Sequence, residues 1–170
     1  MAQSFYINQS MVGVDLNNGN ATALFAVGTH VLGNGGTEWV YVQAGTSIVA
    51  QRMVAYQSGT FTCSMASGAD LVTNGYVIAC SQTSISAQAY GWVCIRGVNL
   101  TVGSSASCTT GPAIGIFLAA AAATGLLSTS ISASGTMAGI SIIDATQSTS
   151  AAGGTIVVNM TWPRTYTQVG

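Results

Sequence analysis

Charged residues are the scarcest part of this sequence. They make up 4% of its 170 residues, against ~25% in ordinary soluble domains. Three arginines stand against four acids, and lysine is absent. Nucleic acids and anionic lipids are bound by clustered basic side chains, so this composition argues against both as direct partners, and no membrane association is expected. A Walker-type phosphate loop is excluded as well, because its lysine is missing.

So few charges also bear on how the chain stays in solution. A soluble monomer normally carries many more charges, which keep its copies apart. We therefore expect much of this surface to lie against other protein. The alternative is a small domain that serine, threonine, asparagine and glutamine keep in solution.

Groups for catalysis are equally sparse. His30 is the single histidine, and no GxSxG segment is present to support a serine hydrolase that uses it as base. The four acids lie in or beside turn-rich stretches, where carboxylates more often hydrate or cap the backbone; they are Asp15, Glu38, Asp70 and Asp144. The sequence therefore predicts a protein that is not an enzyme and that needs no cofactor.

The four cysteines are widely spaced and form no CxxC pair; they are Cys63, Cys80, Cys94 and Cys108. The favoured interpretation is buried thiols in a reducing compartment. A disulfide pair remains an alternative. A metal site is weakly supported, since one histidine and unpaired cysteines give none of the usual zinc spacings.

Long apolar segments are limited to one run. Residues 113–127 are apolar or small, but the run is shorter than the ~20 residues a spanning helix needs. A short helix over its alanines and a buried strand followed by a loop are both compatible with it. The first residues, Met1–Tyr6, lack the basic and apolar regions of a secretory signal, so synthesis in a cytoplasm is expected.

What the sequence does contain is a series of short strands. The clearest is Tyr90–Gly97, in which aromatic and β-branched residues alternate and Gly97 closes the run. Trp92, Cys94 and Arg96 fall on one face, and Val93 and Ile95 on the other. Glu38–Ala44 has the same period and is its expected partner. Both runs are apolar on both faces, which is typical of a barrel or sandwich wall.

Turn residues separate further extended runs along the whole chain. The expected extended runs are 21–27, 29–32, 47–50, 52–56, 60–63, 75–80, 136–143 and 155–162, with Pro163 ending the last one. This pattern predicts an all-β fold, a compact β-barrel or β-sandwich of short antiparallel strands with an N-terminal extended segment. Residues 1–20 form that segment, an arm or a first strand, and residues 21–170 form a single β-rich domain.

Aromatic and arginine side chains are the candidates for an interface. The mid-strand aromatics favour packing in the core or against a neighbouring subunit over a sugar-stacking platform. Arg96 and Arg164 stand beside tryptophans at strand ends, where a guanidinium can bond a carboxylate or stack on an aromatic ring across an interface, or serve surface solubility alone. The candidate interface residues are Phe5, Tyr6, Trp39, Tyr41, Trp92, Arg96, Trp162 and Arg164.

Three stretches carry a resemblance to a known family. Gly36–Ala44 followed by Tyr90–Gly97, the ending Thr155–Arg164 with its Trp-Pro-Arg, and Ala123–Leu126 resemble capsid decoration (cement) proteins of tailed phages. The likeness covers residues 28–164 and departs from the family at the Ala119–Ala123 run and in its low charge.

The resemblance implies a small β-rich virion protein on the exterior of an icosahedral capsid. Such a protein binds the major capsid protein in assembled shells, often as a homotrimer that bridges capsid subunits, after synthesis in the host cytoplasm. The leading segment would then be an arm that orders on a neighbour. Two other hypotheses stay open: a carbohydrate-binding or host-adhesion module on a virion or cell surface, and a hydrolase using His30.

Overall fold

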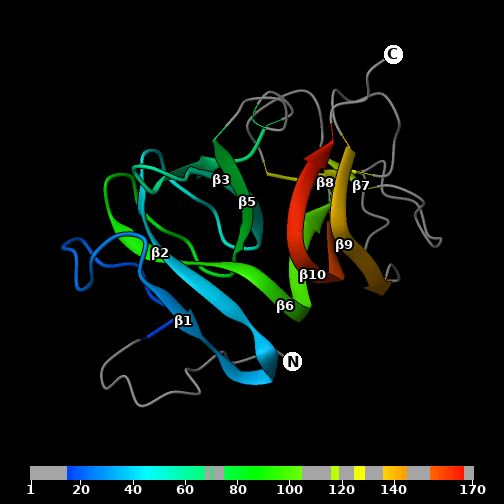
Figure 1. The fold of residues 1–170 in the computed structure, drawn as a ribbon, viewed down its shortest axis with the longest axis horizontal. Helices are drawn as coiled ribbons and strands as arrows, with labels where there is room; N and C mark the ends of the chain where they lie inside the picture. The colour runs from blue at the N-terminus through cyan, green and yellow to red at the C-terminus, as the bar shows by residue number, and fades with distance from the viewer. Residues whose placement is uncertain are drawn as a thin grey trace.

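The structure, a computed structural model, describes residues 15–67, 70, 75–104, 116–118, 125–128, 136–144 and 154–166. Within these residues the fold is all-β, as the sequence predicts, with ten strands and one short 3-10 helix. The expected strands over 21–27 and 47–50 are wrong, since 21–27 form turns and bends and Ile48 makes only an isolated bridge with Ile85. Figure 1 shows the arrangement of the strands. The elements are β1 (His30–Leu32), η1 (Asn34–Gly36), β2 (Glu38–Ala44), β3 (Arg52–Gln57), β4 (Thr62–Met65), β5 (Tyr76–Ser81), β6 (Tyr90–Ser104), β7 (Ile116–Leu118), β8 (Leu127–Ser128), β9 (Thr136–Asp144) and β10 (Gly154–Tyr166).

Five strands close into a barrel. Their order is β2-β4-β3-β5-β6, and β6 pairs back with β2 to complete the ring. All neighbours run antiparallel except β2 and β4, which are parallel. Alternate side chains from all five strands meet in one buried cluster, which therefore fills the interior of the barrel; it includes Val40, Val42, Val54, Tyr56, Cys63, Ala79, Val93 and Ile95.

A second ring of strand pairings begins where the first ends. β6 continues into the order β6-β10-β9-β7-β8, and β8 pairs back with β6 at Ser104 and Leu127. The first part of β6, from Tyr90 to Arg96, pairs with β2, and its later part pairs with β10 as far as Ser104. In Figure 1, β6 accordingly runs from the side of β2 to the side of β9 and β10. One long strand is thus a wall of both rings.

The predicted partnership at the centre of the chain is confirmed. Glu38–Ala44 pairs antiparallel with Tyr90–Arg96, and both strands are buried on both faces. The expected end at Gly97 is wrong, because β6 runs on to Ser104. Gly97 lies where pairing passes from β2 to β10, and a Cβ there would lie 3.1 Å from the Thr37 side chain and 3.2 Å from Cys94 Sγ. Glycine therefore allows the close packing at the point where β6 changes partners, and it does not mark the end of the strand.

Pro163 also does not end its strand. β10 extends to Tyr166, and the register with β9 shifts between Met160 and Arg164. Proline cannot donate a ladder hydrogen bond, and it is tolerated at a bulge where no rung needs that donor. The irregularity around Pro163 therefore lets the strand continue.

Two further predictions meet the limits of the described residues. In the apolar run 113–127, Ile116–Leu118 is a strand and β8 begins at Leu127, whereas the alanines 119–123 lie outside the described residues. In the leading segment, residues 1–14 lie outside them too. Leu16 is buried in the core and Asn20 bridges to Tyr90, so residues 15–20 pack on the barrel.

A second core cluster lies on the outer face of the barrel. It joins the large side chains of β2 and β6 to apolar residues of β10, among them Ile156, Val158 and Met160. Leu16, Phe25 and Val31 from the segment before β2 complete it. The segment from residue 15 to β1 therefore covers one face of the barrel. This second cluster contains residues of both rings and so packs them together.

Candidate functional site

Three of the predicted interface residues are core residues. Trp39 and Tyr41 are fully buried and Trp92 is 1% exposed, all within a single chain. The Trp92 ring lies 4.9 Å from that of Tyr41 and 5.5 Å from that of Phe25, and the Leu24 amide donates to the Tyr41 hydroxyl at 3.1 Å. Of the alternatives for these rings, core packing is correct. Their faces are covered by the chain itself, so neither a partner subunit nor a sugar can stack on them.

Four other predicted interface residues cannot be placed in the same way. Phe5 and Tyr6 lie outside the described residues. Trp162 and Arg164 lie in the last part of β10, where the structure describes the backbone. Their interface role stays a prediction.

Arg96 is the remaining candidate, and it forms an ion pair within the chain. Its Nη1 donates to Glu38 Oε1 at 3.0 Å, across the rung where β2 and β6 pair. The Arg96 side chain is 49% exposed and that of Glu38 16% exposed. The guanidinium bonds a carboxylate, as one alternative predicted, but the carboxylate belongs to its own chain.

Because Arg96 is half exposed, its ion pair should contribute little to stability. We expect Arg96→Met, which keeps the apolar stem, to lower the free energy of unfolding by less than about 1 kcal/mol. Urea unfolding at low and high salt measures this. A loss well above that value would contradict the surface character of the pair; Glu38→Gln is the matched variant on the other side.

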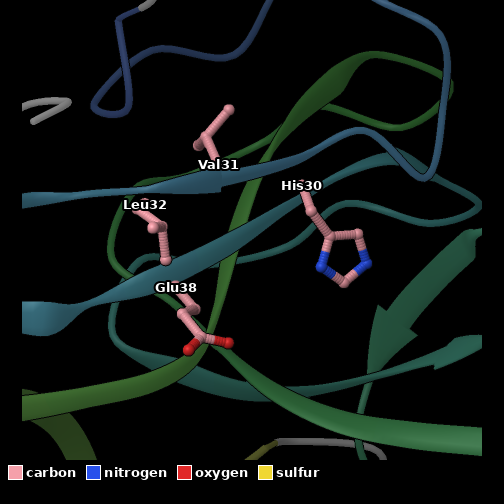
Figure 2. A pocket seen from close by; sticks show the side chains of 4 residues that line it. All are labelled: His30, Val31, Leu32 and Glu38. Atoms are coloured by element: carbon pink, nitrogen blue, oxygen red, sulfur yellow. The ribbon is translucent and has the colours of Figure 1, made fainter. Parts of the chain in front are cut away.

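His30 and Glu38 line one small pocket of about 90 Å³ together with Val31 and Leu32. Figure 2 shows His30 and Glu38 on the adjacent strands β1 and β2, with Val31 pointing to the opposite side. Among the described residues no hydrogen bond or ion pair joins His30 to a carboxylate, and the Glu38 carboxylate is bound to Arg96. No described serine or cysteine lines the pocket. His30 and Glu38 thus line the same pocket. A hydrolytic triad requires a nucleophile hydrogen-bonded to a base and that base hydrogen-bonded to an acid, and the described residues of this pocket do not form such a chain.

The described cysteines are buried free thiols, as the favoured interpretation expects. They are Cys63, Cys80 and Cys94; Cys108 lies outside the described residues. Burial raises the pKa of Cys80 to about 12 and raises the pKa values of Cys63 and Cys94 far above their ordinary range. Within the described part of the chain, no three metal-ligating side chains gather.

The feature that the sequence reasoning missed is the free edge at β1. Closing two rings leaves β1 as the one described strand with a single neighbour, β2. Tyr41 N–H bonds Thr29 C=O, and Gly33 N–H bonds Thr37 C=O. These two bonds show which residues in and beside β1 direct their backbone groups toward β2. In an antiparallel ladder the residues that bond the partner alternate, so the N–H and C=O groups of His30 and Leu32 point away from β2. No other strand in the described part of the chain pairs with them.

Apolar side chains accompany this edge. The described residues include six exposed large hydrophobics, and three of them, Leu24, Val27 and Leu32, lie on β1 or just before it. We call these three residues together with the outward backbone of β1 the β1 edge. The sequence carries little signal for it. The alternation of one buried and two exposed positions in His30-Val31-Leu32 is visible only in the structure, and an edge strand and a central strand look alike over three residues.

Comparison with known proteins gave no match: no family model, no curated protein and no solved structure matches this chain. Among the residues that the structure describes, no helix has the length and hydropathy needed to cross a membrane.

Proposed function

We propose that this chain is a non-enzymatic structural protein of a virion that binds the outer surface of an assembled icosahedral phage capsid and stabilises it. The proposal extends the sequence resemblance to capsid decoration proteins, and the homotrimeric state comes from that resemblance. Its partners are other copies of itself and the major capsid protein.

The observation that carries the proposal is the β1 edge on an almost uncharged chain. The protein has seven formally charged side chains, three arginines and four acids. Exposed apolar side chains beside unpaired backbone groups suit a surface that another protein covers. A single edge next to a rigid barrel supports a binding role better than it supports catalysis.

We assign the β1 edge to the major capsid protein rather than to a small ligand. An extended segment of that protein can add as a strand beside β1, bonding His30 and Leu32 through its backbone while Leu24, Val27 and Leu32 contact its side chains. Binding restricted to the assembled shell stabilises that shell by mass action, and many equivalent sites multiply a modest contact.

The test is binding to shells built from the major capsid protein encoded in the same genome. The purified protein is expected to elute as a small oligomer, to co-sediment with expanded shells until sites saturate, and to leave unassembled capsid protein in the supernatant. A monomer that ignores the shells would remove the proposal.

One pair of variants tests the β1 edge itself. Leu32→Lys places a charge beside the unpaired strand and should weaken shell binding at least about tenfold, since lysine on an edge opposes strand addition. Val49→Lys is the matched control, because Leu32 and Val49 are both 47% exposed. Val49 follows β2 at the end away from β1, so this variant should bind normally. Equal binding by both variants would contradict the assignment of the edge.

The carbohydrate-binding alternative keeps a separate test. It predicts glycan binding that vanishes with an aromatic substitution in a protein that is still folded. Trp39, Tyr41 and Trp92 are buried, so none of these three rings presents a free face for it.

A further inference from the structure

Two of the buried thiols face one another across a strand pair. Cys80 on β5 and Cys94 on β6 are direct partners in the antiparallel ladder. Directly opposite residues share a face, and both side chains belong to the same core cluster. Their Cα atoms are therefore ~4.5–5.5 Å apart, within the range that a disulfide spans.

The other described cysteine is excluded by its position. Cys63 lies in the cluster that fills the barrel interior, on the opposite face of the wall. A disulfide between Cys63 and either of the others would have to pass through the sheet. The fold therefore selects one pair out of the three described thiols.

This pair occupies a distinctive place in the barrel. Cys80 and Cys94 form the single rung recorded between β5 and β6, and that rung completes the five-strand ring. A bond here would join covalently the two strands with the fewest ladder contacts in the barrel. The bond would replace three weak hydrogen bonds: Cys94 Sγ donates to the Arg96 carbonyl at 3.0 Å, Cys80 Sγ donates to the Ser81 carbonyl at 3.7 Å, and Cys80 Sγ accepts from Gln82 Nε2 at 2.9 Å.

We propose that Cys80 and Cys94 are a modification site, at which an oxidised low-molecular-weight disulfide converts the two thiols into a cross-strand disulfide that locks the barrel. One cysteine thiolate attacks oxidised glutathione, forming a mixed disulfide and releasing one glutathione. The second thiolate then attacks the mixed disulfide at the protein sulfur and releases the second glutathione. Two protein thiols are oxidised, one glutathione disulfide is reduced, and the two thiol protons end on the two glutathione molecules.

Both thiols are buried, so the reaction should be slow in the folded protein. Burial also raises their pKa values, which reduces the thiolate available to attack. The oxidation should therefore proceed at the rate at which the β5–β6 rung opens, and mild urea should accelerate it.

The experiment incubates the full, reduced chain with oxidised glutathione at pH 8 and follows its intact mass. The expected product is about 2 Da lighter, without bound glutathione, and has a thermal midpoint raised by about 5–10 °C. Chymotrypsin cleaves at Tyr90 and Trp92, between the two cysteines, so a peptide pair joined through Cys80 and Cys94 identifies the bond.

Variants separate this pair from the remaining thiols. Cys94→Ala and Cys80→Ala should abolish the mass loss, and Cys63→Ala should retain it. If either alanine variant fails to fold, the peptide map of the unmutated chain decides. Free Cys80 and Cys94 after full opening and reclosure in the oxidant, or a bond mapped to Cys63 or Cys108, would overturn the proposal.

Discussion

Replacing Trp92 by alanine should destabilise the protein by about 3–5 kcal/mol, the usual cost of truncating a buried tryptophan. Trp92 is 1% exposed and its ring contacts Phe25 and Tyr41, so the substitution leaves a cavity where the covering segment meets the barrel. Since domains are stable by only about 5–15 kcal/mol, the loss is a large share of the total. Urea unfolding followed by tryptophan fluorescence and circular dichroism measures it.

The control lies on the same strand. Val98 is exposed, and Val98→Ala should change the free energy of unfolding by no more than about 0.5 kcal/mol. The same pair of variants distinguishes the functional hypotheses. A Trp92→Ala protein of unchanged stability that has lost a glycan ligand would favour the adhesion alternative and contradict the core role of the ring.

The reduced protein should lose stability steeply in alkali. Cys63, Cys80 and Cys94 have an ordinary pKa of 9.0 and raised pKa values in the folded state because burial disfavours the thiolate. Below pH 9 both states keep the thiols protonated and stability is complete. Above it the unfolded chain ionises first and binds fewer protons, so unfolding is favoured as pH rises toward the folded pKa values. Three thiols together give a loss of about 4 kcal/mol per pH unit.

Tyr56 adds to the same effect at higher pH. Burial and the neighbouring Cys63 raise its pKa from 10.0 to about 12, so its contribution begins above pH 10. The urea midpoint of the reduced protein should therefore fall from pH 9 upward and more steeply above pH 10, with the thiols alone responsible between pH 9 and pH 10. Cys63→Ala should remove about one third of the slope over this range, and a midpoint that stays constant to pH 10 would contradict the burial of the thiols.

The strands were predictable from the sequence where the pattern was local. The alternation in Glu38–Ala44 and Tyr90–Gly97 places β-branched residues on both faces, which is sufficient to predict two neighbouring buried strands. The pairing order was not predictable in the same way. The return of β6 to β2 and the second ring through β8 depend on contacts between residues far apart in the chain.

The candidate site was harder to predict because a residue buried in a core and a residue buried in an interface produce the same pattern in the sequence. Trp39, Tyr41 and Trp92 look identical in sequence whether their own chain or a neighbour covers them; here the Phe25 ring packs against Tyr41 and Trp92. The β1 edge gave the opposite problem. Leu32 is an ordinary apolar residue in the sequence, and in the structure it is exposed on the face of β1 opposite to that of the buried Val31.

The strand common to both rings joins the described strands into one cooperative unit. Any force or fluctuation that peels β10 from β6 also removes support from the wall on which β2 and β5 close. A cut near Gly97 would therefore yield two unstable fragments rather than two smaller barrels. A particle coated with such a chain would lose each copy in one all-or-none event, without a partly unfolded copy remaining bound.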